Sequence, residues 1–346
     1  MPEPAETRIG LTEYQLRVAV REAIVESANS LSQEALTLSD ASIRYLSYIE
    51  QVLGRKPSTL QDYRSILTRH FNPFFADRAL GSISVNLITD YAEAKRAEGL
   101  KLKTVANHLA LLHAVLAHAV KRGWLSRNAA AALDRPAKAG SSADARFLTS
   151  EELGTLVAAV PDDALGPTDR ALYLTAALTG LRQGELVALR WRDIDWSAGV
   201  VRVRRSFTRG KFGTPKSRRS SRAVPIAHRL KAALSAHFWT SEYPASDDLV
   251  FAHPRTGGPY DPSRMRKRFY GAVDRADVER VRFHDLRHTF GTRMAAVGTP
   301  LRAIQEWMGH SSYQTTMMYA HYAEDSSRGA EWVDRAFGGV ATDPLR

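Results

Sequence analysis

The chain has 346 residues, a formal net charge of +11 and a pI near 9.9. This basic balance predicts attraction to a polyanion, and nucleic acid is the usual one. The absence of cysteine excludes disulfides, thiolate catalysis and cysteine-ligated zinc. Residues 1–10 are polar and acidic, unlike a secretory signal, and no apolar run is long enough to span a bilayer. We therefore expect a cytoplasmic, nucleoid-associated protein that does not enter a membrane.

The first part of the chain follows a helical pattern, in which apolar side chains recur every three or four positions. Residues 1–36 predict one amphipathic helix, an N-terminal helical extension. Residues 37–134 predict a compact helical domain with basic loops. Its four helices are expected in this order: one that ends at Gly54, one capped by Ser58, one over residues 85–97 and one over residues 104–122.

Residues 135–146 have the composition of a linker, because they lack periodicity and large apolar side chains. A second domain, residues 147–346, begins with a helix for which Thr149 and Glu152 form a capping box. Its further expected elements are a helix over 167–179, a hairpin of strands 199–206 and 221–226 around a glycine-rich loop, a short strand over 249–251, and helices to about residue 336. The predicted fold class is mainly α with a small β-hairpin or sheet.

Positive charge gathers in the predicted hairpin. No acidic residue occurs between Asp195 and Glu242. A solvated face normally mixes both signs, so this window predicts a surface that follows DNA phosphates. Its basic residues are Arg202, Arg204, Arg205, Arg209, Lys211, Lys216, Arg218, Arg219 and Arg222.

Five residues with distinctive chemistry lie in the second domain. Arg182 and Arg287 offer permanent positive charge that matches phosphate geometry. His284 and His310 can donate or relay a proton near neutral pH. Tyr319 carries a hydroxyl that can serve as a covalent nucleophile. Together these residues predict chemistry on a phosphodiester, through a phosphotyrosyl intermediate and without a metal.

Each of these residues also has an ordinary structural explanation. Arg182 would serve equally as a surface arginine paired with Glu185, and Tyr319 as a core tyrosine packed on neighbouring methionines. His284 and His288 have the i,i+4 spacing of metal ligands. We reject a metal site because no glutamate occupies the HExxH position and no cysteine completes a ligand set.

In combination, the motifs resemble the tyrosine recombinase (phage integrase) family. The segments that carry the resemblance are Thr-Gly-Leu-Arg182-Gln-Gly-Glu185 for the first arginine box, Phe-His284-Asp-Leu-Arg287 for the HxxR box, Gly-His310 followed nine positions later by Tyr319 for the final box, and Lys216 ahead of Val-Pro for the catalytic lysine. The resemblance covers residues 39–325. It implies a helical core-binding domain followed by a mixed α+β tyrosine-recombinase catalytic domain.

The resemblance implies a division of labour around the scissile phosphate. Tyr319 would attack the phosphate and keep the 3′ end as a phosphotyrosine, and His284 would accept or donate a proton near it. Arg182 and Arg287 would hold the non-bridging oxygens. His310 would add a further hydrogen-bond donor to them.

Two assignments in this division stay open. Lys216 would protonate the departing 5′ oxygen, but Lys211 also lies in the hairpin loop. Tyr313 and Tyr322 flank Tyr319, and spacing alone does not exclude Tyr322. Only the histidine-to-tyrosine interval of the family selects Tyr319. Glu185 would orient its neighbours rather than react.

The implied function is that of a site-specific DNA recombinase that cuts and rejoins duplex DNA, integrating or excising a mobile element, with no cofactor, no metal and no ATP. Its implied partners are double-stranded DNA, three further copies in a synaptic homotetramer that exchange residues 324–337, and accessory DNA-bending or directionality proteins. The alternatives are a chromosome-resolution recombinase, a type IB topoisomerase-like enzyme and a catalytically silent DNA-binding regulator.

Overall fold

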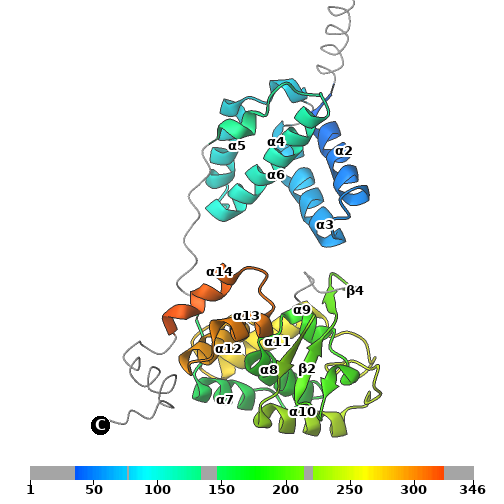
Figure 1. The fold of residues 1–346 in the computed structure, drawn as a ribbon, viewed down its shortest axis with the longest axis vertical. Helices are drawn as coiled ribbons and strands as arrows, with labels where there is room; N and C mark the ends of the chain where they lie inside the picture. The colour runs from blue at the N-terminus through cyan, green and yellow to red at the C-terminus, as the bar shows by residue number, and fades with distance from the viewer. Residues whose placement is uncertain (1–35, 76–77, 134–145, 214–220, 323–346) are drawn as a thin grey trace, which may run out of the picture. The chain divides into compact units, whose positions relative to one another are not determined.

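The computed structural model describes residues 36–75, 78–133, 146–213 and 221–322. The chain divides into two compact units, Met1–Gly140 and Ser141–Arg346 (Figure 1). None of the helices among the described residues combines the length and the apolar composition needed to cross a membrane. The expected helix over residues 1–36 lies outside the described residues except at its last position, as do nearly all of the expected linker and the C-terminal residues 324–337.

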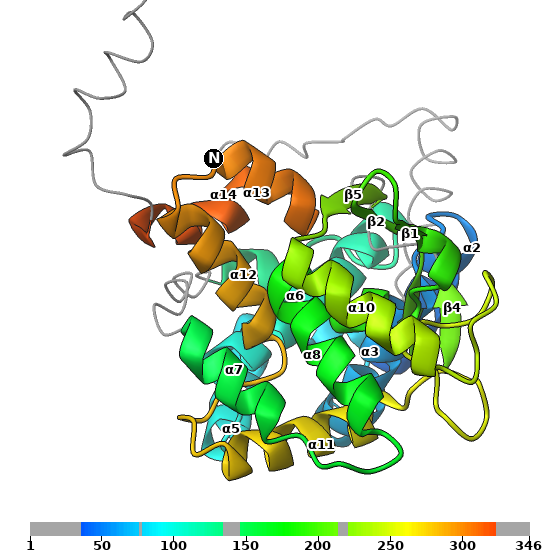
Figure 2. The same cartoon turned by 90° about the horizontal axis from the view of Figure 1, so that it is seen from below.

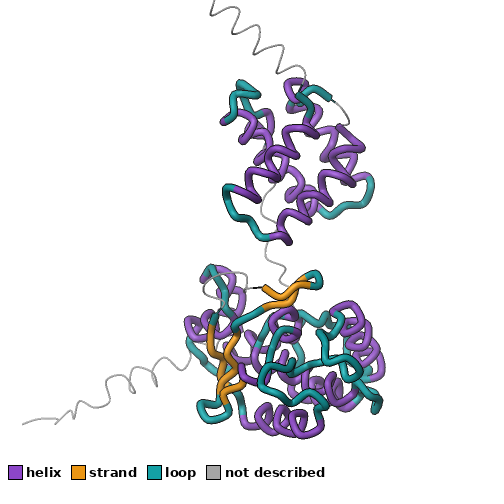
Figure 3. The backbone as a smooth tube through the Cα atoms, turned by 90° about the vertical axis from the view of Figure 1, so that its right-hand side faces the viewer, coloured by secondary structure: helices purple, strands orange, loops and turns teal. Residues whose placement is uncertain are grey.

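The helices of the first unit are joined by loops, and its described part contains no strand (Figure 3). Its elements are α2 (Leu38–Gln51), α3 (Pro57–Ile66), a π-helical stretch (Leu67–Phe71), α4 (Asn72–Phe75), α5 (Val85–Ala97), α6 (Leu102–Lys121) and 3₁₀ turns at Leu80–Ser82 and Ala129–Ala132. The prediction for α5 is confirmed at both ends, because the Ser84 side chain caps its start. The cap at Ser58 is wrong. Pro57 occupies the first turn and Lys56 the N-cap, since proline needs no hydrogen-bonded N–H there.

The core of this first unit contains a buried tyrosine–histidine pair. The Tyr91 hydroxyl lies 2.8 Å from Nδ1 of His108, and these residues are 0% and 3% exposed. Phe71 and Phe75 pack against the tyrosine ring at centroid distances of 5.4 and 5.1 Å. Burial raises the pKa of Tyr91 above its ordinary value and lowers that of His108 to about 4, so both groups are uncharged near pH 7.

The second unit is built around α8, which contacts α7, α10 and α12 (Figure 2). Its helices are α7 (Ser150–Ala158), α8 (Gly166–Thr179), α9 (Gln183–Val187), α10 (His228–Thr240), α11 (Pro262–Arg275), α12 (Asp285–Ala296), α13 (Leu301–Met308) and α14 (Tyr313–Thr316), with 3₁₀ turns at Trp191–Asp193 and Met317–Tyr322. The capping box of Thr149 and Glu152 is confirmed. So is the end of α8 at Gly180, whose φ of 63° favours glycine.

The strands of the second unit form two small antiparallel sheets. β1 (Ile194–Asp195), β2 (Val200–Val203) and β5 (Arg222–Pro225) form the first, in which Val201 pairs with Val224. β3 (Ser206–Thr208) and β4 (Lys211–Gly213) form a second hairpin inside the expected loop. The predicted β2–β5 pairing is confirmed. The predicted strand over 249–251 is wrong, because Leu249 makes only an isolated bridge to Arg190.

Candidate active site

Arg182 lies at the turn between α8 and α9. Its backbone N–H donates to Glu185 Oε2 at 2.8 Å, and its Nη1 donates to Oε1 at 3.0 Å. The turn is tight at Gly180, where an added Cβ would lie 2.6 Å from the Phe290 ring. The carboxylate of Glu185 caps the start of α9, where exposed backbone N–H groups favour an anion.

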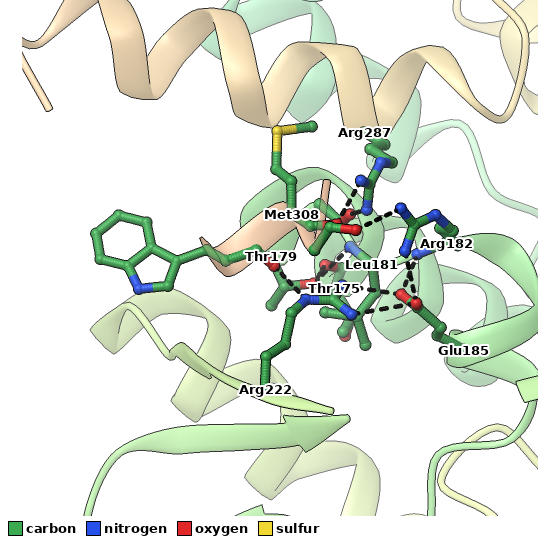
Figure 4. Close-up of polar contacts among 11 residues, drawn as sticks. Thr175, Thr179, Leu181, Arg182, Glu185, Arg222, Arg287 and Met308 are labelled. Carbon is green, nitrogen blue, oxygen red and sulfur yellow. Dashed lines mark hydrogen bonds and ion pairs between the residues drawn. The ribbon is translucent and has the colours of Figure 1, made fainter. Parts of the chain in front are cut away.

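Three arginines from different elements hold the last carbonyl groups of α13 (Figure 4). Arg222 donates to the carbonyl of residue 307, Arg287 to that of residue 308, and Arg182 to that of residue 309, the last at 2.8 Å. The final carbonyls of a helix have no partner within the helix, and positive charge is favoured there. The three contacts therefore fix the backbone just before His310.

Arg222 and Glu185 form a buried ion pair beneath these carbonyls. Two nitrogens of Arg222 donate to the carboxylate, at 3.1 and 2.9 Å, and the side chains are only 5% and 2% exposed. Burial alone would raise the pKa of Glu185, but Arg222, together with Arg182, outweighs it and lowers the pKa. The expectation that Arg222 follows DNA phosphates is therefore wrong in this structure, because its guanidinium is used inside the protein.

Arg287 is the most enclosed of the three arginines, with 4% of its surface exposed. It also donates to the carbonyl of Gly180, so it joins the end of α8 to the end of α13. Burial, and then the nearby charge of Arg182, lowers the pKa of Arg287 to about 9, at which it still carries its charge at neutral pH. Three guanidinium groups lie near one carboxylate, so the cluster holds excess positive charge in a largely buried site.

Tyr319 is buried against α12, with 1% of its surface exposed. Its hydroxyl lies 2.9 Å from Nδ1 of His288, and its ring lies nearly parallel to that of His310 at a centroid distance of 6.3 Å. Burial raises the pKa of Tyr319 to about 12, although the charge of Arg287 opposes the shift. The tyrosine therefore lies within the electrostatic reach of the arginine cluster and keeps its proton at neutral pH.

Of the two predicted histidines, His310 faces the ring of this tyrosine, whereas His284 contacts His288. His310 is buried, and its Nδ1 lies 2.9 Å from the Thr316 hydroxyl. Burial, followed by the charge of Arg287, lowers its pKa to about 3, so the ring is neutral and can donate one hydrogen bond. His284 precedes α12, and its ring packs against the ring of His288 with a distance of 5.2 Å between the ring centroids. His288, rather than His284, contacts the tyrosine hydroxyl. The sequence signal for His288 is its i,i+4 spacing from His284, which by itself indicates only a possible pair of metal ligands.

Among the other candidates, Tyr322 is half-exposed and packs edge-on against Phe147 at 5.2 Å. Tyr313 is exposed. Lys216 lies outside the described residues, whereas Lys211 lies in β4 with its side chain exposed. The structure therefore brings together five of the six predicted site residues, Arg182, His284, Arg287, His310 and Tyr319.

The other hairpin arginines are partly paired with acidic residues outside the charge window. Arg202 lies 2.8 Å from Asp195, and Arg205 lies 2.5 Å from Asp193. The window contains no acid, but the chain segment just before it folds beside β2. The sequence count therefore overstated the uncompensated charge on this part of the hairpin. Arg218 and Arg219 lie outside the described residues.

Within the described residues, His, Asp and Glu side chains form no group of three or more that could hold a metal ion.

Comparisons with known proteins agree along most of the chain. A model of the phage integrase family matches residues 146–326, and a model of the phage integrase N-terminal SAM-like domain matches residues 43–123. The putative prophage phiRv2 integrase of Mycobacterium tuberculosis is 30% identical over 288 residues, which cover 80% of this chain and 72% of that protein. The tyrosine recombinase XerC of Halalkalibacterium halodurans is 29% identical over 297 residues, which cover 82% of this chain and 93% of that protein.

Solved structures show the same fold. The Tn1549 transposon integrase in complex with a circular intermediate DNA matches with a TM-score of 0.68 and 19% identity, over 87% of this chain and 99% of that one. The lambda integrase tetramer bound to a Holliday junction matches with a TM-score of 0.65 and 21% identity, over 86% of this chain and 88% of that one. The predicted fold class, mainly helical with small sheets, is confirmed.

Proposed function

The chain belongs to the phage integrase family of tyrosine recombinases, enzymes that cleave and rejoin DNA, and on this premise we propose that Tyr319 is the residue that becomes joined to the DNA. One observation carries the proposal. A buried tyrosine hydroxyl lies beside a cluster in which three guanidinium groups outnumber one carboxylate. A phosphodiester brings one negative charge and gains another as the tyrosine attacks it. The excess charge of the cluster would offset both.

Arg182 and Arg287 would hold the non-bridging oxygens of the scissile phosphate. A guanidinium has five N–H donors, and the contacts of Arg182 to Glu185 and Gly309 use two of its nitrogens. Its side chain is 30% exposed, which leaves it a path to the phosphate. His310 would add a neutral donor, and Glu185 would hold the arginines in place rather than react.

The leaving group needs a proton of its own. Lys216 remains our proposed donor to the 5′ oxygen, on the family resemblance, with His284 moving a proton near the nucleophile. Lys216→Ala should slow cleavage by about 10²–10⁴-fold. A substrate with sulfur at the bridging 5′ position should restore the rate, because thiolate leaves without a proton. If this substrate rescued Lys211→Ala instead, the donor would be Lys211.

We further propose that the reaction integrates or excises a mobile element. Support comes from relatives named as prophage and ICEBs1 integrases, the latter from Bacillus subtilis and 30% identical over 308 residues, which cover 84% of this chain and 80% of that protein. The lambda integrase structure is a tetramer on a Holliday junction. We propose the same assembly on double-stranded DNA for this chain, in association with the nucleoid and with accessory DNA-bending or directionality proteins.

A nicked suicide substrate tests the proposed nucleophile. The wild-type protein should form a covalent DNA adduct that survives a denaturing gel and persists in EDTA. Tyr319→Phe should bind the same DNA with nearly unchanged affinity, since affinity comes mainly from phosphate contacts, and should form no adduct. An adduct in Tyr319→Phe, or one that requires magnesium, contradicts the proposal. DNA binding without any adduct in the wild type would indicate a silent regulator.

A further inference from the structure

The surface of α12 is shaped to hold the ring of Tyr319. His288 and Gly291 are three residues apart, so they lie on the same face of the helix. A Cβ at position 291 would lie 2.5 Å from the tyrosine Cζ, so only glycine lets the ring lie this close to the helix. With His310 nearly parallel to the ring and His288 at the hydroxyl, the nucleophile is fixed on several sides.

The protonation states of the pair suit a proton transfer. Burial lowers the pKa of His288 from its ordinary 6.5, so the ring is neutral near pH 7. Tyr319 keeps its proton there, because burial raises its pKa to about 12. In the tautomer that carries its proton on Nε2, Nδ1 of His288 accepts the hydrogen bond of the tyrosine at 2.9 Å. The bond lies along the path that the proton must take when the oxygen attacks.

We propose that His288 is a further catalytic residue, the general base that accepts the Tyr319 proton as the tyrosine oxygen attacks the phosphate. The bond from tyrosine oxygen to phosphorus forms as the proton moves to Nδ1 of His288, which becomes an imidazolium. The bond from phosphorus to the 5′ oxygen breaks, and that oxygen takes a proton from its own donor. The inference rests on the proposed function of Tyr319. In this proposal His284 contacts the base, His288, and does not itself contact the tyrosine hydroxyl.

The charged and titratable groups around His288 determine the pH range in which the test can be read. Asp285, Arg282, Arg287 and His284 face it from its own helix and the preceding turn, and Tyr319 and His310 from the C-terminal segment. The pKa of His284 is lowered to about 4 and that of His310 to about 3, mainly by burial, while that of Arg287 is lowered to about 9. A profile between about pH 6 and pH 8 therefore avoids most of their titrations.

Single-turnover cleavage of a suicide substrate with a 5′-bridging sulfur isolates the nucleophile, because the leaving group then needs no acid. For the wild type, we expect a rate that is nearly flat from pH 7 to pH 8. His288→Asn keeps an acceptor for the tyrosine hydrogen bond but not a base. It should be about 100-fold slower at pH 7, with a rate that rises almost tenfold per pH unit as the tyrosine ionises unaided.

Two further variants separate proton transfer from mere positioning. Gly291→Ala should displace the ring and slow cleavage by the same factor at every pH. His108→Asn alters the matched pair in the first unit and should leave the shape of the pH profile unchanged. Restoration of the His288→Asn rate at high pH, without restoration of Gly291→Ala, is the signature of a lost base.

Several results would overturn the inference. His288→Asn with the wild-type rate and profile would do so, as would a loss of equal size at every pH. If His288→Asn failed to bind DNA, the wild-type profile alone would decide, because a rate that rises tenfold per pH unit from pH 6 excludes a histidine base. An adduct in Tyr319→Phe would instead overturn the proposed function itself. That outcome is distinct from an inert His288.

Discussion

Two tyrosine–histidine pairs of nearly identical geometry occur in the two units of this protein. Tyr91 with His108 and Tyr319 with His288 each join a hydroxyl to Nδ1, at 2.8 and 2.9 Å, and both tyrosines are at most 1% exposed. The first pair is enclosed by aromatic rings in a helical core. The second lies next to a group of arginines held by the end of α13.

The pairs differ in the charge around them. The Lys95 ammonium, 5.8 Å from the centre of the Tyr91 ring, is held by Glu98, whereas Arg287, near Tyr319, belongs to a cluster in which arginines outnumber carboxylates. Burial raises the pKa of both tyrosines. For Tyr91 the neighbouring Glu98 adds to the rise, whereas for Tyr319 the charge of Arg287 opposes it. A buried tyrosine that contacts a histidine is thus a stabilising core element in one unit. In the other, nearby cations that can bind phosphate turn the same pair into a candidate nucleophile and base.

Among the changes that test this comparison, the largest expected effect comes from removing the charge next to Tyr319. Arg287→Ala should slow cleavage by about 10²–10³-fold, because a buried donor to the transition state is lost. A substrate with a 5′-bridging sulfur should not restore the rate, since the charge acts on the phosphate and not on the leaving group. Single-turnover adduct formation measures this effect. If the sulfur substrate fully restored the rate, Arg287 would act on the leaving group. The charge of Arg287 would then not explain the difference between the two tyrosine–histidine pairs.

Arg222→Ala tests the support beneath that charge. The variant leaves Glu185 buried with one fewer partner, and we expect a loss of about 3 kcal/mol in the free energy of unfolding. The pKa of Glu185 is lowered in the folded protein, so its contribution is complete above about pH 4.5 and is lost as the pH falls through the folded value. Urea unfolding should therefore show that the difference in unfolding free energy between the wild type and Arg222→Ala becomes smaller below pH 4.5.

Arg268→Ala is the matched control for Arg222→Ala. Arg268 pairs with Asp163 and Asp169 on another face of the same unit, at 2.8 and 2.6 Å. It should lower stability without a selective loss of cleavage. Arg222→Ala should also slow cleavage, because the backbone before His310 loses one of its three tethers. Equal cleavage by the two variants would show that Arg222 only stabilises the fold.

Substitutions of Tyr91 or His108 in the first unit should change the stability of the fold but not the cleavage reaction. Tyr91→Phe leaves His108 without its buried partner and should cost about 1–2 kcal/mol of unfolding free energy. The pKa of His108 is lowered to about 4, so acid favours the unfolded chain as the pH falls below the ordinary histidine value of 6.5. His108→Asn should flatten that part of the pH–stability curve. Loss of adduct chemistry in Tyr91→Phe at full DNA occupancy would contradict the comparison.

The smallest expected effect concerns the positive charge that the sequence assigns to DNA binding. Arg218→Ala should weaken DNA binding and lower the salt dependence of affinity by about one unit of slope, with no change in the rate of bound complexes. Arg202→Ala should change the slope less, because Arg202 already pairs with Asp195 at 2.8 Å. Binding titrations at several salt concentrations give both slopes. An equal slope change for the two variants would show that the internal pair opens on DNA.

Local sequence signals predicted the elements that depend on local physics. α5 and the capping box at Thr149 follow from caps, glycine stops and periodicity within a few residues. The pairing of β2 with β5 follows from two strand patterns on either side of a glycine-rich segment. The strand predicted over 249–251 failed because a buried apolar run does not specify its hydrogen-bond partner. β3 and β4 were missed because their segment had been interpreted as a loop.

For the candidate site, too, local motifs predicted some features, and others depend on contacts between distant parts of the chain. The motifs identified Arg182, Arg287, His310 and Tyr319, which the fold brings together. The pair of Arg182 with Glu185 was among the sequence expectations, but the carbonyl partners of the arginines could not be predicted, because a guanidinium and the carbonyl it binds lie up to 127 residues apart. Arg222 was assigned to DNA for that reason. His288 was missed as a partner of the tyrosine because only the fold places its Nδ1 at the hydroxyl.

The most direct test of the central claim is to map the covalent adduct on the wild-type protein. After reaction with a suicide substrate, nuclease trimming and proteolysis, mass spectrometry locates the tyrosine that carries the nucleotide remnant. The account predicts modification of Tyr319, the buried tyrosine beside the arginine cluster, and none of Tyr91, Tyr313 or Tyr322. Modification of Tyr322, which packs on Phe147 instead, would contradict it.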